Sequence, residues 1–313
     1  MSEEVRRAAE ILRRGGLVAF PTETVYGLGA DASSAAAVAR LYAVKGRPGS
    51  HPVIVHFATV EQAFSWAREV PDAARRLAAR FWPGPLTLIL KRAPHAGDFV
   101  TGGQDTIGLR VPAHPAAQAL LREFGGPIAA PSANRFGRVS PTCAEHVRQD
   151  LGTAVDLVLE GGSSEVGIES TIVDLSRGRA VLLRPGAISP AELEDALGAS
   201  LAMPDAGAPR ASGTLERHYA PKTPLRLVPA HALDAEIART RGSVAVLAFS
   251  RPDERAASWL RMPRDAASYA HRLYAALREL DGAGCAQILV EQPPDEPAWL
   301  AVRDRLKRAA TPA

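Results

Sequence analysis

The sequence predicts an α/β protein with a larger N-terminal domain and a smaller C-terminal one. Short apolar runs typical of strands alternate with amphipathic helical patterns along most of the 313 residues, and this length favours two domains over one. The alternation stops once, at residues 198–224, which are rich in Pro, Gly, Ala and Ser. We therefore expect domains at 1–197 and 225–313, joined by a linker at 198–224.

The first half of the N-terminal domain begins with a helix and a strand. Residues 2–14 are amphipathic and end at Gly15-Gly16, because glycine suits the end of a helix. The apolar run 17–20 predicts a strand, and 33–46, which opens on serine, predicts a helix. Further strands are expected at 52–57, 84–92 and 106–112, and further helices at 60–69, 72–82 and 114–124.

The rest of the chain divides into a mixed part and a regular part. A strand at 127–134 and a helix at 141–152 precede strands at 154–162, 169–175 and 180–186 and a helix at 190–197. The βαβ order is not strict here, which favours a twisted mixed sheet with flanking helices. Beyond the linker, strands at 225–228, 243–250 and 286–292 alternate with helices at 231–239, 265–280 and 296–309. This regular alternation predicts a doubly wound, Rossmann-like domain.

Composition excludes several classes of protein. A net charge of +3 is too weak for a protein that coats DNA, but it is compatible with an anionic ligand in a local pocket. Cys143 and Cys285 lie far apart, so we expect neither a disulfide framework nor a zinc site, and no metal site. The N-terminus lacks the apolar core of a signal peptide, and no apolar run reaches the roughly 18 residues of a membrane span. We expect a cytoplasmic protein with no membrane partner.

Six stretches at predicted strand ends are more polar than a strand requires. The chain has no Walker loop, no strand-linked GxGxxG, no HExxH and no GxSxG. The six stretches are 21–26 with Thr22, Glu23 and Thr24; 45–56 with Lys45, Arg47, His51 and His56; 106–112 with Thr106 and Arg110; 130–142 with Ser132, Asn134 and Ser140; 167–175 with Glu169, Ser170 and Thr171; and 182–186 with Arg184. Strand ends are where α/β folds bind ligands, so together these stretches favour a binding site.

Each stretch taken alone also has an ordinary structural interpretation. Lys45 and Arg47 suit the negative end of a helix dipole. Arg110 could form a structural ion pair, because a charge inside an apolar strand must be paired or face a polar cavity. His56 alone reads as a core histidine, and the Ser-Ala-Asn and Glu-Ser-Thr stretches read as turns and caps.

The polar stretches occur within motifs that identify a family. "PTETVYGLGADA", "KGRPGSHPVIVH", "FWPGPLTLIL", "IGLRVP", "APSAN" with "SPT", "ESTIVDL" and "LLRPG" resemble the YrdC-type threonylcarbamoyl-AMP synthases. "HYAPKTP" followed by an α/β domain resembles their long, two-domain form. The matching motifs run in the family's order from residue 15 to about 224. The resemblance implies a YrdC-like N-terminal domain.

The resemblance implies a reaction and its partners. L-threonine, bicarbonate and ATP, with Mg²⁺ carried by the nucleotide, would give threonylcarbamoyl-adenylate and pyrophosphate. A tRNA-modifying transferase complex would then pass the threonylcarbamoyl group to the adenosine next to the anticodon; direct binding of tRNA stays open. Because charge gathers on carboxylate, carbamate and triphosphate, arginine, lysine and hydroxyl groups are the expected stabilisers.

The resemblance also assigns roles to residues. Threonine would be held by Thr24, His56, Arg110, the backbone of Ala130 and Ser170, with the guanidinium of Arg110 forming a fork on the carboxylate. ATP would contact Arg47, His51, Thr106, Ser132, Ser140, Arg184 and Tyr219, and the catalytic pair Lys45 and Arg47 would border bicarbonate and the phosphates. The family often has Asn at the position of His51, and the linker start at 212–217 also departs from its pattern.

The linker is expected to act as a lid. A carbamate and a carbamoyl–phosphoryl anhydride both decompose in water, so the site needs to shut. Residues 198–224 suit a mobile strap, and "RHYAPK" brings polar donors and the ring of Tyr219. The alternative is a passive tether.

Two other functions stay open at this point. One is an RNA-binding or ribosome-associated module of the same fold, which the weak net charge and the 5% aromatic content disfavour. The other is a carbamoyl transferase or hydrolase for a different compound, whose relatives carry zinc-finger parts that the two cysteines of this chain are too few to build. Threonine-dependent release of pyrophosphate from ATP separates all three.

Overall fold

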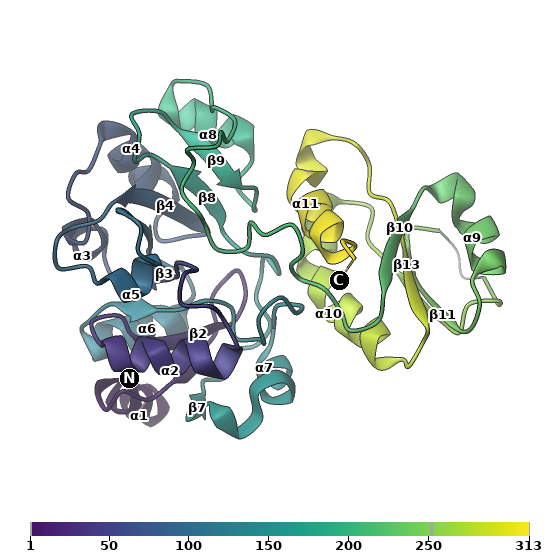
Figure 1. Cartoon of the computed structure of the whole chain (residues 1–313), viewed down its shortest axis with the longest axis horizontal. Helices are drawn as coiled ribbons and strands as arrows, with labels where there is room; N and C mark the ends of the chain where they lie inside the picture. The colour runs from purple at the N-terminus through teal and green to yellow at the C-terminus, as the bar shows by residue number, and fades with distance from the viewer. Residues whose placement is uncertain (1, 251–252, 313) are drawn as a thin grey trace. The chain divides into compact units, whose positions relative to one another are not determined.

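The computed structural model of the protein describes residues 2–250 and 253–312, and the chain forms two compact units (Figure 1). Unit 1 comprises Met1–Phe136, Pro141–Glu165 and Glu169–Thr214, and unit 2 comprises Gly137–Ser140, Val166–Ile168 and Leu215–Ala313. The stretch expected as a linker, 198–224, is therefore divided between the units after Thr214.

Unit 1 is built on a nine-stranded sheet. Its strands are β1 (Val18–Phe20), β2 (Gly27–Asp31), β3 (Ile54–His56), β4 (Leu86–Lys91), β5 (Thr106–Arg110), β6 (Ile128–Ala129), β7 (Leu157–Val158), β8 (Thr171–Asp174) and β9 (Val181–Arg184). Their order across the sheet is β7-β1-β2-β6-β3-β5-β4-β8-β9. The pairs β1–β7, β3–β5 and β4–β8 are parallel, and the other pairs are antiparallel. The predicted mixed sheet is confirmed.

Helices cover this sheet because its strands alternate apolar side chains between two faces. The helices of unit 1 are α1 (Glu3–Arg13), α2 (Ala35–Lys45), α3 (Val60–Ser65), α4 (Asp72–Phe81), α5 (Asp98–Thr101), α6 (Pro115–Phe124), α7 (Ala144–Leu151) and α8 (Pro190–Leu197), with a 3₁₀ turn at Gly152–Ala154. Along the first strand, Val18 and Phe20 pack with α1 and α6. Leu17 and Ala19 point the other way and pack with α2 and α7.

Several elements of unit 1 differ from the sequence prediction. Strand β2 and the short helix α5 were not predicted, and helix α3 ends at Ser65 instead of reaching residue 69. The strand expected at 154–162 is reduced to the two residues of β7. The strand expected at 127–134 ends at Ala129, because the next residues enter a turn that contains prolines and small polar residues.

Unit 2 is a parallel sheet with helices on both faces. Its strands are β10 (Leu225–Val228), β11 (Val244–Ala248), β12 (Ser258–Arg261) and β13 (Gln287–Glu291), in the order β10-β13-β11-β12. Its helices are α9 (Leu233–Arg239), α10 (Ala266–Gly282) and α11 (Leu300–Ala309), with 3₁₀ turns at Ala230–Ala232 and Pro297–Trp299. Figure 1 shows α9 on the opposite side of the sheet from α10 and α11. The predicted doubly wound domain is confirmed, although β12 was not predicted.

None of the helices in residues 2–250 and 253–312 has the length and apolar character that crossing a membrane requires.

Candidate active site

One face of the unit 1 sheet combines a polar row with an apolar row. Strand side chains alternate between faces, so residues two apart share a face. On four central strands these pairs are His56 with Ile54, Arg110 with Gly108, Thr87 with Ile89, and Ser170, just before β8, with Ile172. The three isoleucines form one buried cluster with Ala211, and His56 and Arg110 are direct cross-strand partners.

This arrangement refines what the sequence indicated. His56 closes its strand, as expected, whereas Arg110, which was expected inside a strand at 106–112, is the last residue of β5. The polar residues are brought together, however, because they lie on the same face of the sheet and not because they lie at strand ends. A Cβ built on Gly108 would meet Ile89, Ile54 and Thr87 at 3.2–3.6 Å, which shows how closely the side chains of this face pack.

Arg110 makes an ion pair that the sequence left as an alternative. It is buried, and its Nη2 donates to Oε1 of Glu23 at 2.6 Å and to Oγ1 of Thr24 at 3.0 Å. Burial raises the pKa of the Glu23 carboxyl, but the charge and hydrogen bond of Arg110 outweigh this, so the pKa lies below its usual value. Arg110 therefore has a permanent partner before any ligand binds.

His56 offers an open hydrogen-bonding atom on the same face. Its imidazole is buried, and Nδ1 has no hydrogen-bond partner within residues 2–250 and 253–312. Burial and the neighbouring charge of Arg110 lower the pKa of His56 to about 3. A neutral, buried ring with an open nitrogen suits a ligand that brings its own polar group.

Ser170 and Arg184 form a network at the next strands. The hydroxyl of Ser170 lies 2.8 Å from Oγ1 of Thr87 and accepts from Nη2 of Arg184 at 3.1 Å. The Nε of Arg184 donates to the carbonyl of Ser170 at 3.0 Å. Its Nη1 donates to the carbonyl of Ser212 at 2.7 Å, so this arginine joins the polar face to residues 210–214.

Arg47 reaches the same serine from the other side. Its Nη2 donates to the carbonyl of Pro52 at 2.7 Å and to the hydroxyl of Ser212 at 3.4 Å. Its guanidinium carbon lies 5.5 Å from the centre of the Phe136 ring. Two arginines expected to bind ATP thus converge on Ser212.

His51 lies against Phe136, the same ring that Arg47 covers. The ring centres of His51 and Phe136 are 5.4 Å apart in an edge-to-face arrangement. Burial lowers the pKa of His51, and the charges of Arg47 and Arg210 lower it further.

Lys45 is a buried cation at the end of helix α2. Its Nζ donates to the backbone carbonyls of Ser132, at 2.5 Å, and of Asn134. Burial lowers the pKa of Lys45 well below its ordinary value, and the charge of Arg47 adds to this. The helix end and the 132–134 turn are thereby held together through one ammonium group.

The remaining expected site residues lie in three places. Thr106 opens β5 on the same face as Arg110, at the other end of the strand. The N–H of Ala130 donates to the carbonyl of Ile54, so the Ala130 carbonyl is the backbone group left for a ligand. Ser140 and Tyr219 belong to unit 2, where Tyr219 is buried, with the Tyr274 ring centre at 5.8 Å and the Arg305 guanidinium at 5.1 Å.

Family models match nearly the whole chain. Residues 10–186 match the model described as "Telomere recombination", and residues 188–311 match "Threonylcarbamoyl-AMP synthase, C-terminal domain". The threonylcarbamoyl-AMP synthases of Bacillus subtilis and Pyrococcus abyssi are 40% and 39% identical to the chain. Both alignments cover 98% of this chain, with 93% of the first relative and 94% of the second. The chain belongs to the threonylcarbamoyl-AMP synthase family.

A solved structure of the family shares the fold of this chain. The crystal structure of Pyrococcus abyssi Sua5 with L-threonine has a TM-score of 0.93 and 38% identity, and covers 98% of this chain and 94% of its own. Membership of the threonylcarbamoyl-AMP synthase family confirms the interpretation of the sequence as an adenylate-forming enzyme over that as an RNA-binding module.

Sequence reasoning assigned no role to several residues that the structure brings to the site of this synthase. Thr87 and Ser212 carry hydrogen bonds of the network, and Phe136 underlies Arg47 and His51. Threonine is common in strands, so Thr87 within an apolar run did not indicate a functional site. Glu23 did give one, because a carboxylate directly after an apolar strand requires a partner.

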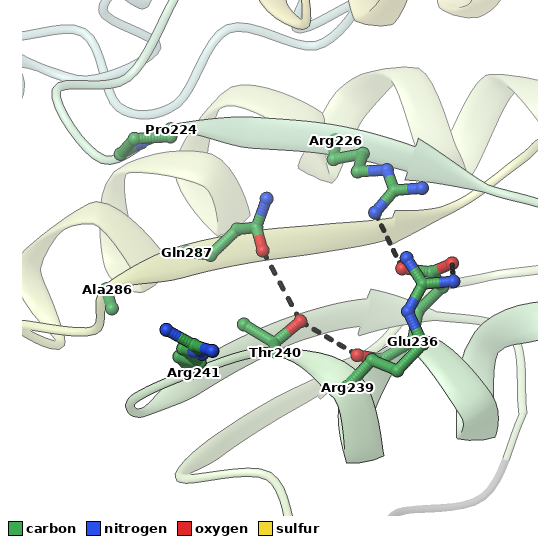
Figure 2. Close-up of a pocket in the computed structure, with 8 residues that line it drawn as sticks. All are labelled: Pro224, Arg226, Glu236, Arg239, Thr240, Arg241, Ala286 and Gln287. Carbon is green, nitrogen blue, oxygen red and sulfur yellow. Dashed lines mark hydrogen bonds and ion pairs between the residues drawn. The ribbon is translucent and has the colours of Figure 1, made fainter.

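A separate hollow of about 390 Å³ lies in unit 2 (Figure 2). It is lined by Pro224, Arg226, Glu236, Arg239, Thr240, Arg241, Ala286 and Gln287. Arg226 and Arg239 pair with Glu236 at 2.6 and 3.3 Å. Arg239 and Arg241 flank the C-terminal end of α9, where cations stabilise the helix dipole, so their presence needs no ligand.

No group of three or more His, Cys, Asp or Glu side chains in the described part of the chain is placed to hold a metal ion.

The buried imidazole predicts a dependence of stability on pH. The pKa of His56 is 6.5 when unfolded and about 3 when folded, so its stabilising contribution is complete above pH 6.5 and is lost as the pH falls towards 3. At about pH 5 the loss is about 2 kcal/mol. Urea unfolding should therefore show that the free energy of unfolding drops between about pH 7.5 and pH 5 in the wild type. In His56→Gln this drop should be smaller by the same amount. The exposed His95→Gln is the control, and equal pH dependence in all three proteins would contradict the assignment.

Proposed function

We propose that the chain makes threonylcarbamoyl-adenylate and pyrophosphate from L-threonine, bicarbonate and ATP on the polar face of unit 1. The observation that carries the proposal is the buried row of His56, Arg110, Thr87 and Ser170, in which the Nδ1 of His56 has no protein partner within the described residues. Burying polar side chains costs free energy unless they make hydrogen bonds, and a polar substrate could make those bonds. Membership of the synthase family suggests which substrate this is.

Threonine is the proposed ligand of this row. Arg110 would meet its carboxylate, and His56, Thr24, Ser170 and the Ala130 carbonyl would meet its ammonium and hydroxyl groups. Arg110 and Thr24 are hydrogen-bonded to each other, and His56 is the cross-strand partner of Arg110, which supports a shared ligand. The related Pyrococcus abyssi structure contains L-threonine.

ATP is proposed to lie towards Arg47, His51, Thr106, Ser132 and Arg184. The convergence of Arg47 and Arg184 on Ser212 supports this, because two buried guanidinium groups close together favour an anion between them. Mg²⁺ would arrive with the nucleotide. Ser140 and Tyr219 remain proposed ATP contacts, with residues 198–224 as the lid.

The chemistry needs stabilisation of negative charge more than a nucleophilic side chain. The threonine amine adds to bicarbonate and loses water to form a carbamate, whose oxygen attacks the α-phosphorus of ATP while pyrophosphate leaves. Lys45 and Arg47 are proposed to stabilise the carbamate and the phosphate oxygens, and fixed donors in a buried site are effective at this. A tRNA-modifying transferase complex would then consume the adenylate.

The test is a threonine-dependence experiment. We expect pyrophosphate release from ATP with Mg²⁺ to require threonine and bicarbonate together, as followed by a coupled phosphate assay in bicarbonate-depleted buffer. Omission of either should reduce release to the background of ATP without enzyme. Equal release without threonine would contradict the proposal, and release supported by RNA in place of threonine would favour a different activity.

A further inference from the structure

Glu23 is a buried carboxylate for which the proposed function has no use so far. It lies on the loop between β1 and β2, and only 5% of it is exposed. Its Oε1 accepts from Nη2 of Arg110 at 2.6 Å, and its Oε2 accepts from the N–H of Ala113 at 3.0 Å. Both oxygens are therefore occupied by the end of β5 and the loop that follows it, so Glu23 acts on the site through Arg110.

This pairing limits how Arg110 can meet a substrate. Nη2 donates to both Glu23 and Thr24, and Nε points to the carbonyl of Gly84 at 3.4 Å. A fork that uses both Nη atoms would need an N–H of Nη2 that already has a partner. Nη1 has no hydrogen bond within residues 2–250 and 253–312, so this nitrogen is the one that remains for an incoming carboxylate.

Beside this pairing, the bond from the Thr22 hydroxyl to the Val25 carbonyl sets the direction of a chain of hydroxyl groups. The hydroxyl of Thr22 donates to the carbonyl of Val25 at 2.6 Å, so its oxygen must accept the proton of Thr24 at 2.9 Å. The oxygen of Thr24 in turn accepts from Arg110. The single proton of Thr24 is thus committed, and this hydroxyl can offer a ligand only a lone pair.

We propose that Glu23 is a positioning residue that holds Arg110 with Nη1 towards the substrate carboxylate, beside the Thr24 oxygen that accepts an N–H or O–H of the same amino acid. This inference rests on the proposed function and specifies how its threonine site works. It replaces the expected guanidinium fork with recognition through one nitrogen. The low pKa of Glu23 agrees with it, because the carboxylate stays ionised wherever the enzyme is folded at neutral pH.

The test is a double-mutant cycle on threonine binding, measured by calorimetry in the full chain. Truncation of one partner of a buried charge pair typically lowers affinity by at least about 30-fold, and we expect this for Arg110→Ala. Glu23→Ala should weaken threonine binding by about 10-fold or more. Because Glu23 acts through Arg110, the double variant should bind threonine no more weakly than Arg110→Ala alone.

Threoninamide provides a readout that a merely structural role would not change. This analogue lacks the carboxylate, so Glu23→Ala should weaken threonine binding but leave threoninamide binding within about threefold of the wild type. Glu23→Gln keeps the size of the side chain but can accept a hydrogen bond at only one of the two positions. It should therefore lose less threonine affinity than Glu23→Ala, and it should likewise affect threonine more than threoninamide. It replaces Glu23→Ala in the cycle if the alanine variant does not fold.

The outcomes separate this inference from the function on which it rests. If the wild type does not bind threonine, the proposed function itself is wrong. If Arg110→Ala loses threonine while Glu23→Ala and Glu23→Gln keep it, only the positioning role is overturned. Additive losses in the double variant would also overturn that role, because Glu23 would then contact the substrate independently of Arg110.

Discussion

Lys45→Met is expected to lower threonine-dependent pyrophosphate release by at least about 100-fold, the usual effect of removing one fixed donor from a site that stabilises negative charge. Lys45 is fully buried, and within the described residues no carboxylate lies within ion-pair distance of its ammonium group. Methionine fills a similar volume and removes the charge. The rate should be measured at saturating ATP and threonine, so that the loss appears in kcat.

The fold should tolerate this change better than the chemistry does. Removing a buried cation relieves its desolvation, while the carbonyls of Ser132 and Asn134 lose a donor, at a typical cost of about 1–3 kcal/mol for a group left unsatisfied. These effects oppose each other, so the melting temperature should change by only a few degrees.

Two further variants sharpen the test of Lys45. Lys91→Met makes the same change at a partly exposed lysine, whose ammonium lies 3.6 Å from Glu69, and should keep the wild-type rate. Lys45→Arg should not restore activity, because the larger planar group does not fit a compact buried position. A folded Lys45→Met enzyme with near-normal kcat would overturn the proposed role of this lysine.

Local sequence patterns were sufficient for most elements that carry a continuous apolar stripe or run. The alternation in residues 17–20 predicts β1, and the structure uses both of its faces. Strand β2 was not predicted because Gly27 and Gly29 interrupt the apolar pattern and have low strand propensity. The structure explains Gly29: a Cβ there would lie 2.9 Å from both Phe20 and Ile128, so the sheet needs a glycine at a position where propensity argues against a strand.

The arrangement of the site could be predicted only in part. Motifs pointed to His56, Arg110, Ser170 and Arg184, but strand register, which places the first three on one face, is not encoded in any local stretch. The partner of Arg110 lies 87 residues away in the chain, so a sequence pattern could show that a partner was needed without showing which residue it is. Ser212 was missed for a related reason: its function comes from a carbonyl and a hydroxyl that meet two distant arginines.

Arg184→Ala is expected to weaken the binding of both substrates, and ATP more strongly. Direct loss of a buried guanidinium from a phosphate group should cost about 30-fold or more in ATP affinity. Threonine affinity should fall by only about three- to tenfold, because Arg184 reaches threonine through Ser170, whose hydroxyl and carbonyl it holds at 3.1 and 3.0 Å. Calorimetric titration of each ligand separately measures both losses.

The ratio of the two losses distinguishes Arg184 from its neighbours. Arg177→Ala removes an arginine from the turn between β8 and β9 that pairs with Asp174 and Asp205, so it should change stability but neither affinity. Arg47→Ala should reduce ATP affinity alone, because Arg47 contacts Ser212 and Pro52 but has no hydrogen bond to Ser170 among those described. If folded Arg184→Ala keeps ATP affinity within threefold, the nucleotide does not lie between the two arginines. If it loses ATP but keeps threonine, Ser170 holds its orientation through Thr87 alone.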